Sequence, residues 1–203
     1  MRDLHTLALS RIRGFRKAKD GATAIEFALL AIPFFSLLFA ILELAIIFFL
    51  SSTLSHAVSE SGRLIRVGSF QGCGQAAFKH AVCSRMNAIG NCDKNLRIDV
   101  VSQPTFNAIT LVAPPPPPTL VGVPNPTIPN GQFVNTVAGS PVVVRALYYH
   151  KLLLPAELTR LENVPGSQTH VIRSTTAFRN EPFPTAACAS PPAPTPPPPS
   201  PSP

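Results

Sequence analysis

The sequence predicts an α+β protein: a long N-terminal transmembrane helix that extends into a small head with an antiparallel sheet, followed by a proline-rich disordered tail. Three observations lead to this fold class. An apolar run fills residues 27–50, three later segments have the composition of β-strands, and most of the 24 prolines of the 203-residue chain lie after residue 100. Because proline interrupts helices and sheets, regular structure cannot run unbroken through the second half.

The first 20 residues form a basic segment ahead of the apolar run. They hold six arginines or lysines and two aspartates, a net charge of +4 out of +7 for the whole chain. Positive charge beside a membrane helix marks its cytoplasmic flank. Aromatic residues are not interleaved with the basic ones and tryptophan is absent, so we expect no stacking surface for bases and no nucleic-acid partner.

The run from Phe27 to Leu50 contains 24 residues and a single charge, Glu43. A helix of this length spans about 36 Å, enough to cross a hydrocarbon core of about 30 Å. A cleaved secretory signal is the rival interpretation, but its apolar core would be shorter, and here the helical pattern continues beyond the run. Pro33 removes a backbone hydrogen bond and should kink the helix. We expect Glu43 near the opposite membrane face, where water reaches it.

Helical periodicity continues past the apolar run. An apolar stripe predicts that the first helix projects to about Val67, with Gly68 ending it. A second helix is expected over residues 75–88, where apolar residues recur at helical spacing. The sequence therefore predicts a membrane helix whose outer half packs on the head.

Three segments have the composition of strands. They are residues 96–102, 141–153 and 169–178, which are rich in β-branched residues. In the first of them Leu96, Ile98 and Val100 alternate with Arg97, Asp99 and Val101, which is a strand signal. The three segments predict a small antiparallel sheet.

Proline-rich sequence separates and ends these elements. Residues 114–118 should form an extended loop, and the tail 190–203 should be disordered or polyproline II. The expected organisation is therefore a leader (1–21), a transmembrane and projecting helix (22–68), a head (69–189) and the tail.

All four cysteines follow the apolar run, on the side opposite the basic flank. That side is the oxidising one, so two disulfides are expected, and the absence of a C-x-x-C spacing gives metal or redox chemistry little support. Cys83 and Cys92 bracket a helix end and a Gly-Asn turn, which favours a bond between them. Cys73 with Cys188 then follows by elimination, although spacing alone does not determine the connectivity.

A short motif occupies the junction of the basic flank and the apolar run. A small residue, Gly21, gives a peptidase access to the backbone, and Glu26 places a carboxylate at the edge of the hydrocarbon, where it needs a partner. Cleavage after Gly21 would make Ala22 the new N-terminus. Its amine would lie one helical turn from Glu26, so the two could pair within one subunit or between neighbours.

These residues resemble the processing site of type IV prepilins, and more narrowly the TadE-like pseudopilins of the tight-adherence (Tad) pilus system. The resemblance extends over an ordered series of segments. They are GATAIEFALLAIPFF (21–35), LELAIIFF (42–49), SGRLIRVGS (61–69), VCSRMNAIGNC (82–92) and TTAFRNEPF (175–183).

The resemblance implies a pilin-like head and processing by a prepilin peptidase in the bacterial inner membrane, with the head in the periplasm. Gly21 would precede the scissile bond, Ala22 would be the mature N-terminus, and Glu26 and Phe27 would follow as in prepilins. The implied partners are pilin and other pseudopilins, a membrane assembly platform and the lipid bilayer. The large C-terminal domain departs from the major pilin pattern and favours a minor, assembly role in the pilus.

The rival function is that of a permanently anchored, unprocessed envelope protein with a binding or structural head. An enzyme is not expected: the five histidines are scattered, and the nucleophile elbow, Walker loop and dinucleotide motifs are missing from the sequence. We therefore expect no catalytic, metal or cofactor site.

Overall fold

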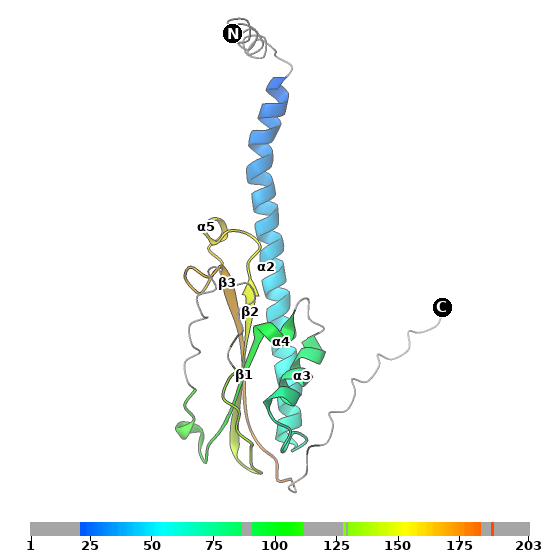
Figure 1. The fold of residues 1–203 in the computed structure, drawn as a ribbon, viewed down its shortest axis with the longest axis vertical. Coiled ribbons are helices and arrows are strands. Elements are labelled where there is room, and N and C mark those ends of the chain that lie inside the picture. Colours follow the sequence, from blue (N-terminus) through cyan, green and yellow to red (C-terminus); the bar gives the residue numbers. More distant parts are fainter. Residues whose placement is uncertain (1–20, 87–90, 112–127, 129, 184–187, 189–203) are drawn as a thin grey trace, which may run out of the picture. The chain divides into compact units, whose positions relative to one another are not determined.

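The computed structural model describes residues 21–86, 91–111, 128, 130–183 and 188. The elements in chain order are α2 (Ala22–Arg66), α3 (Gln75–Met86), α4 (Cys92–Asn95), β1 (Leu96–Ser102), η2 (Phe106–Ala108), β2 (Pro141–Lys151), α5 (Ala156–Thr159) and β3 (Thr169–Arg179) (Figure 1). The expected leader, the end of the second helix, the polyproline loop and the tail lie outside the described residues.

The chain divides into two compact units, residues 1–42 and residues 43–203. α2 supplies the described part of the first unit and also the first element of the second, because the helix runs from Ala22 to Arg66 without a break. We call the second unit the head unit. This division falls inside the helix, because the outer half of the helix belongs to the core of the head unit.

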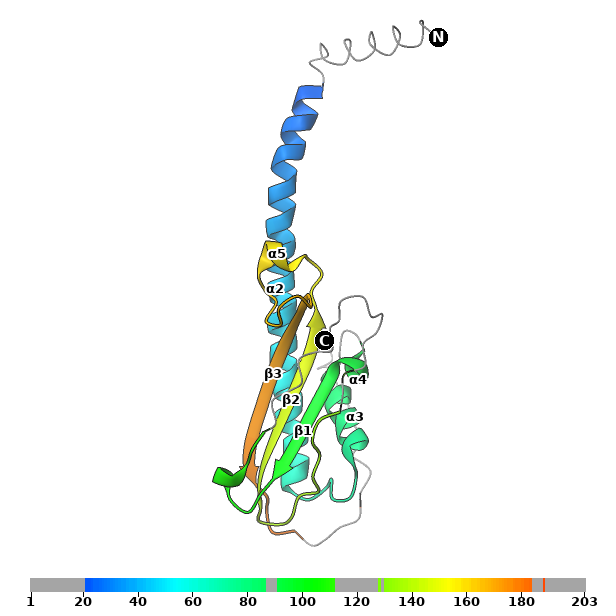
Figure 2. The ribbon, with the colours of Figure 1, turned by 60° about the vertical axis from the view of Figure 1, so that its left-hand side comes forward.

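The sheet of the head unit has the order β1-β2-β3, and both pairs are antiparallel. Figure 2 shows the sheet lying against the outer half of α2, with α3 on the same face. This face carries the main core, in which Leu54, Phe78 and Val144 are fully buried. The α+β fold class and the three strands that the sequence predicts are confirmed.

On β1 the other face of the sheet is buried as well, although its polar residues alternate with apolar ones. Asp99 is 0% exposed and accepts hydrogen bonds from Arg145 on β2, at 2.9 and 2.7 Å, and from the backbone N–H of Gln132 at 2.9 Å. Arg97 lies 3.2 Å from the same carboxylate. Opposite charges that neutralise each other can be buried, so alternation of polar and apolar residues did not mean exposure here.

The end of α2 is held by the segment that follows β3. Arg66 forms an ion pair with Glu181 at 3.2 Å, and the Glu181 N–H donates to the Arg66 carbonyl. Gly68 has a φ of +84°, and an added Cβ there would lie 2.5 Å from the Phe183 ring. Because a left-handed residue ends a helix, Gly68 stops α2 as predicted. The FRNEPF motif therefore has a structural role.

Each outer edge of the sheet is partly occupied by the chain itself. On β1, Val100 exchanges backbone hydrogen bonds with Gln132 and Val134. On β3, the Asn163 side chain accepts from the Val171 N–H at 2.7 Å and donates to the Val171 carbonyl at 2.9 Å. The amide of Asn163 thus takes the place of a strand.

Both disulfides have the pairing that the sequence favours. Cys83–Cys92 closes a short loop after α3 with a Cα–Cα distance of 5.7 Å. Cys73–Cys188 joins residues 115 positions apart with a Cα–Cα distance of 4.9 Å. The longer bond ties Cys188 to the segment between α2 and α3.

Candidate functional site

Gly21 immediately precedes α2, where a peptidase would need access to the backbone. It is exposed, its φ is not positive, and an added Cβ would meet nothing within 4 Å in the described part of the chain. Neither backbone conformation nor packing therefore requires glycine at this position.

Glu26 stands alone in an apolar surface. Of the residues from 21 to 42 it is the only charged one, and its neighbours Ile25 and Phe27 are 64% and 70% exposed. Within the described residues its carboxylate is exposed and forms neither a hydrogen bond nor an ion pair. Because α2 begins at Ala22, Glu26 lies one turn from the first helical residue, as the i, i+4 spacing predicts. The carboxylate is therefore open to a cation from outside these residues.

The helical part of the first unit exposes large apolar side chains on all its faces. Those with more than half of their surface exposed are Ile25, Phe27, Leu29, Leu30, Ile32, Phe34, Leu37, Phe39, Ile41 and Leu42. The described residues contain one helix long and apolar enough to cross a membrane, Thr23–Arg66. This surface is compatible with a membrane-anchored protein. Pro33 lies inside the helix, and the kink expected there stays a prediction.

Glu43 is not in contact with water, which corrects the expectation for this residue. Its side chain is 1% exposed and accepts hydrogen bonds from the backbone N–H groups of Leu153 and, at 3.3 Å, Leu154. The chain after β2 turns back over α2 and covers the carboxylate. Leu50, expected as the end of the membrane span, is 2% exposed and belongs to the core of the head unit.

His150 lies near this buried acid, and His170 is its partner across the β2–β3 pair. Burial lowers the pKa of His150 from its usual value, with a smaller lowering from His170, while Glu43 acts in the opposite direction. His150 Nε2 finds no partner among the described residues, and His170 Nδ1 lies 2.5 Å from the Leu161 carbonyl. Burial therefore favours a neutral His150 imidazole.

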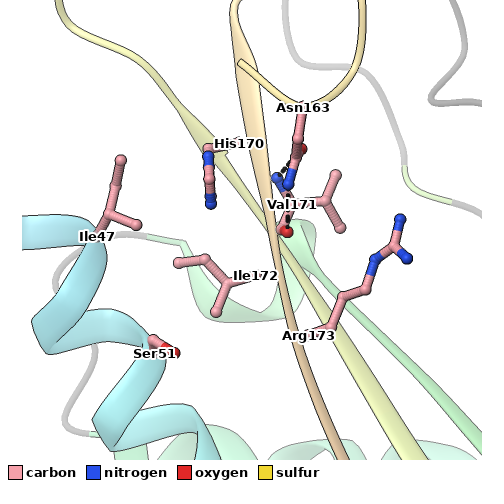
Figure 3. Close-up of a pocket in the computed structure, with 7 residues that line it drawn as sticks. All are labelled: Ile47, Ser51, Asn163, His170, Val171, Ile172 and Arg173. Atoms are coloured by element: carbon pink, nitrogen blue, oxygen red, sulfur yellow. Dashed lines mark hydrogen bonds between the residues drawn. The ribbon is translucent and has the colours of Figure 1, made fainter. Parts of the chain in front are cut away.

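An open hollow of about 450 Å³ separates α2 from β3. Figure 3 shows Ile47 and Ser51 on the α2 side and His170, Ile172 and Asn163 on the opposite side. Asn163 is bonded to the Val171 backbone and His170 to the Leu161 carbonyl. These two polar side chains of the hollow therefore support the fold, and nothing in their arrangement points to a reaction.

Sequence reasoning placed Gly21, Ala22, Glu26 and Phe27 together; Gly21 directly precedes α2, and the other three lie in its first two turns. It missed the role of Glu43, because the two amides that bind it come from residues 110 and 111 positions later. No local pattern signals such a contact. A proline after three leucines at 152–154 is the one hint of a turn near those amides.

Comparison with known proteins agrees with the motif. The model of a family described as TadE-like protein matches residues 21–63. This match confirms the resemblance found in the sequence, and it covers Gly21, the three glutamates of α2 (Glu26, Glu43 and Glu60) and the start of the head unit. No curated protein and no solved structure matches the chain.

Proposed function

Because residues 21–63 are TadE-like, we propose that this chain is a minor pilin-like subunit, a pseudopilin, of a Tad-type adhesion pilus. A prepilin peptidase cuts it after Gly21, and it acts by assembly and not by catalysis. The TadE-like family suggests association with Tad pilus components in general. The single observation that supports the finer role is the lone exposed carboxylate of Glu26, five residues after a glycine that the fold does not need.

In this proposal, cleavage supplies the missing cation. A new amine at Ala22 lies one turn from Glu26 and pairs with it, or with the same group of a neighbouring subunit. In a hydrocarbon environment an unpaired carboxylate is costly, so helices that stack in the wrong axial register are penalised. The pair therefore selects the stagger between subunits.

The membrane provides the setting. The apolar helix anchors the chain in the bacterial inner membrane, with the basic leader in the cytoplasm and the head in the periplasm. Two disulfides suit an oxidising compartment. Partners in this setting are the peptidase, pilin and other pseudopilins, and the assembly platform that moves subunits out of the bilayer.

The experiment is an intact-mass measurement of the chain purified from membranes of cells with and without a prepilin peptidase. We expect the mature protein to begin at Ala22 only when the peptidase is present. Gly21→Leu should abolish this processing, because a bulky side chain blocks access to the scissile bond. Gly14→Leu, a glycine of the same leader outside the motif, is the matched control and should be cut normally.

A chain that begins at Met1 in peptidase-containing cells would contradict the proposal. It would favour the rival function, a permanently anchored envelope protein. Equal processing of the two glycine variants would also count against Gly21 as the recognised residue.

A further inference from the structure

The exposed surface of α2 changes character within the head unit. Leu44, Phe48 and Phe49 are 55%, 76% and 51% exposed. The exposed residues of the helix that follow, up to its end, are polar or charged: Ser52, Ser55, His56, Ser59, Glu60, Arg63 and Arg66. A surface that is apolar up to Phe49 and polar from Ser52 has the form of a membrane boundary.

The head unit begins before this boundary. On the same stretch of helix, Glu43, Ile47 and Leu50 are at most 8% exposed because they face the head unit. From Glu43 to Phe49 is six residues, or about 9 Å along the axis. The first 9 Å or so of the head unit therefore lies beside a helix surface suited to lipid.

The part of the head unit at this level is the connection between β2 and β3. Its backbone binds Glu43 through Leu153 and Leu154, and it contains the short helix α5. Figures 1 and 2 show α5 at the end of the sheet where β2 leads into β3. Two side chains of this connection, Leu153 and Leu158, are 77% and 66% exposed. The connection thus presents apolar side chains outward at the level where α2 does the same.

The covered carboxylate fits the same environment. A charge exposed to lipid is expensive, whereas in water Glu43 would need no cover. Here two backbone N–H groups donate hydrogen bonds to it and the loop covers it, while the outward side of the loop exposes Leu153 and Leu158 together with the charged Glu157. Exposed Lys151 and Arg160 flank the loop, where cations suit lipid phosphates.

We propose that the connection from Leu152 to Leu161 is seated in the interfacial layer of the phospholipid bilayer, with Leu153 and Leu158 at the acyl boundary. With Leu44, Phe48 and Phe49 these leucines form an apolar collar. Successive helix residues are about 100° apart, so Phe48 and Phe49 face different directions. Lipid can contact apolar side chains that face several directions, whereas a single protein partner would cover only one of these directions. This inference rests on the proposed membrane anchoring, and the depth fits interfacial burial of about 5–10 Å.

The chain contains no tryptophan, so the tryptophan fluorescence of a variant with one introduced tryptophan comes from that position alone. We would reconstitute full-length Leu158→Trp and Leu153→Trp in phosphatidylcholine–phosphatidylglycerol vesicles, made with ordinary or with acyl-brominated lipid. Phe35→Trp, in the apolar helix, tests the anchor. Val137→Trp is the matched control, because it is equally exposed, at 67%, but lies before β2.

We expect both loop variants and Phe35→Trp to lose most of their emission in brominated lipid, and Val137→Trp to keep it. Loop variants that stay bright while Phe35→Trp is quenched would overturn the seating of the loop and leave the anchor intact. A blue-shifted but unquenched loop emission would also overturn it, because a protein would then cover the collar. An unquenched Phe35→Trp would refute the membrane anchoring itself.

Discussion

Two glutamates on one helix have opposite surroundings. Glu43 is buried and bound by two backbone N–H groups, whereas Glu26 is exposed and unpaired within the described residues. Burial of an ionised carboxylate is tolerated only when hydrogen bonds replace its water. At the residue scale, Glu43 therefore contributes to the stability of the head unit, and Glu26 is available for assembly.

The first prediction at this scale separates the two roles. Glu43→Gln should lower the free energy of unfolding by about 1–3 kcal/mol, because the amide N–H₂ then faces a backbone donor. Glu26→Gln should leave the unfolding midpoint unchanged and reduce pilus formation. Guanidinium unfolding in detergent can be followed by the emission of Tyr148 and Tyr149, the only tyrosines, which are 2% and 6% exposed. Equal midpoint shifts for the two variants would contradict this division.

At the scale of elements, the junction of α2 with the segment after β3 depends on one glycine. Gly68 combines a positive φ with close contact to the Phe183 ring, whereas Gly72 has a similar φ of +74° and nothing within 4 Å of an added Cβ. The two positions differ only in packing. They therefore allow backbone strain and steric contact to be measured separately.

Gly72→Ala should destabilise the head unit by about 1–2 kcal/mol, the cost of a left-handed alanine. Gly68→Ala should lower the free energy of unfolding by that amount and by about 1–3 kcal/mol more, because the added Cβ overlaps the Phe183 ring. Chemical denaturation measures both values. If the two variants lose the same stability, the ring has moved aside and the contact does not hold the junction.

Elements with local signals were predictable. β1 has the bounds expected from its apolar pattern, and α2 ends next to the predicted glycine. The burial of Asp99 was not predictable, because Arg145 and Gln132 reach it from residues 46 and 33 positions away. The same holds for Glu43. Sequence periodicity reports which residues share a face, but it does not report what covers that face.

At the scale of the whole molecule, two disulfides constrain the chain to different extents. In the chain-entropy relation, a loop of 115 residues contributes about 5 kcal/mol and a loop of 9 about 3 kcal/mol. The longer bond should therefore dominate the stability of the head unit.

Double substitution to alanine tests this order. Loss of Cys73 and Cys188 should lower the unfolding free energy by more than loss of Cys83 and Cys92. Denaturation of the two variants under identical conditions gives the comparison. The reverse order would mean that packing around the shorter bond outweighs its small loop.

The Asn163 amide bonds to the edge of β3, and Gln132 and Val134 bond to Val100 at the edge of β1. These bonds affect how copies of the head unit meet when many of them share one membrane. Open strand edges are templates on which a second chain can add itself. At Val100 and Val171 these backbone groups are already bonded to the same polypeptide, so identical domains held in one membrane plane meet there through side chains and not through backbones. Such neighbours can touch, slide and separate again without fusing their sheets into an aggregate.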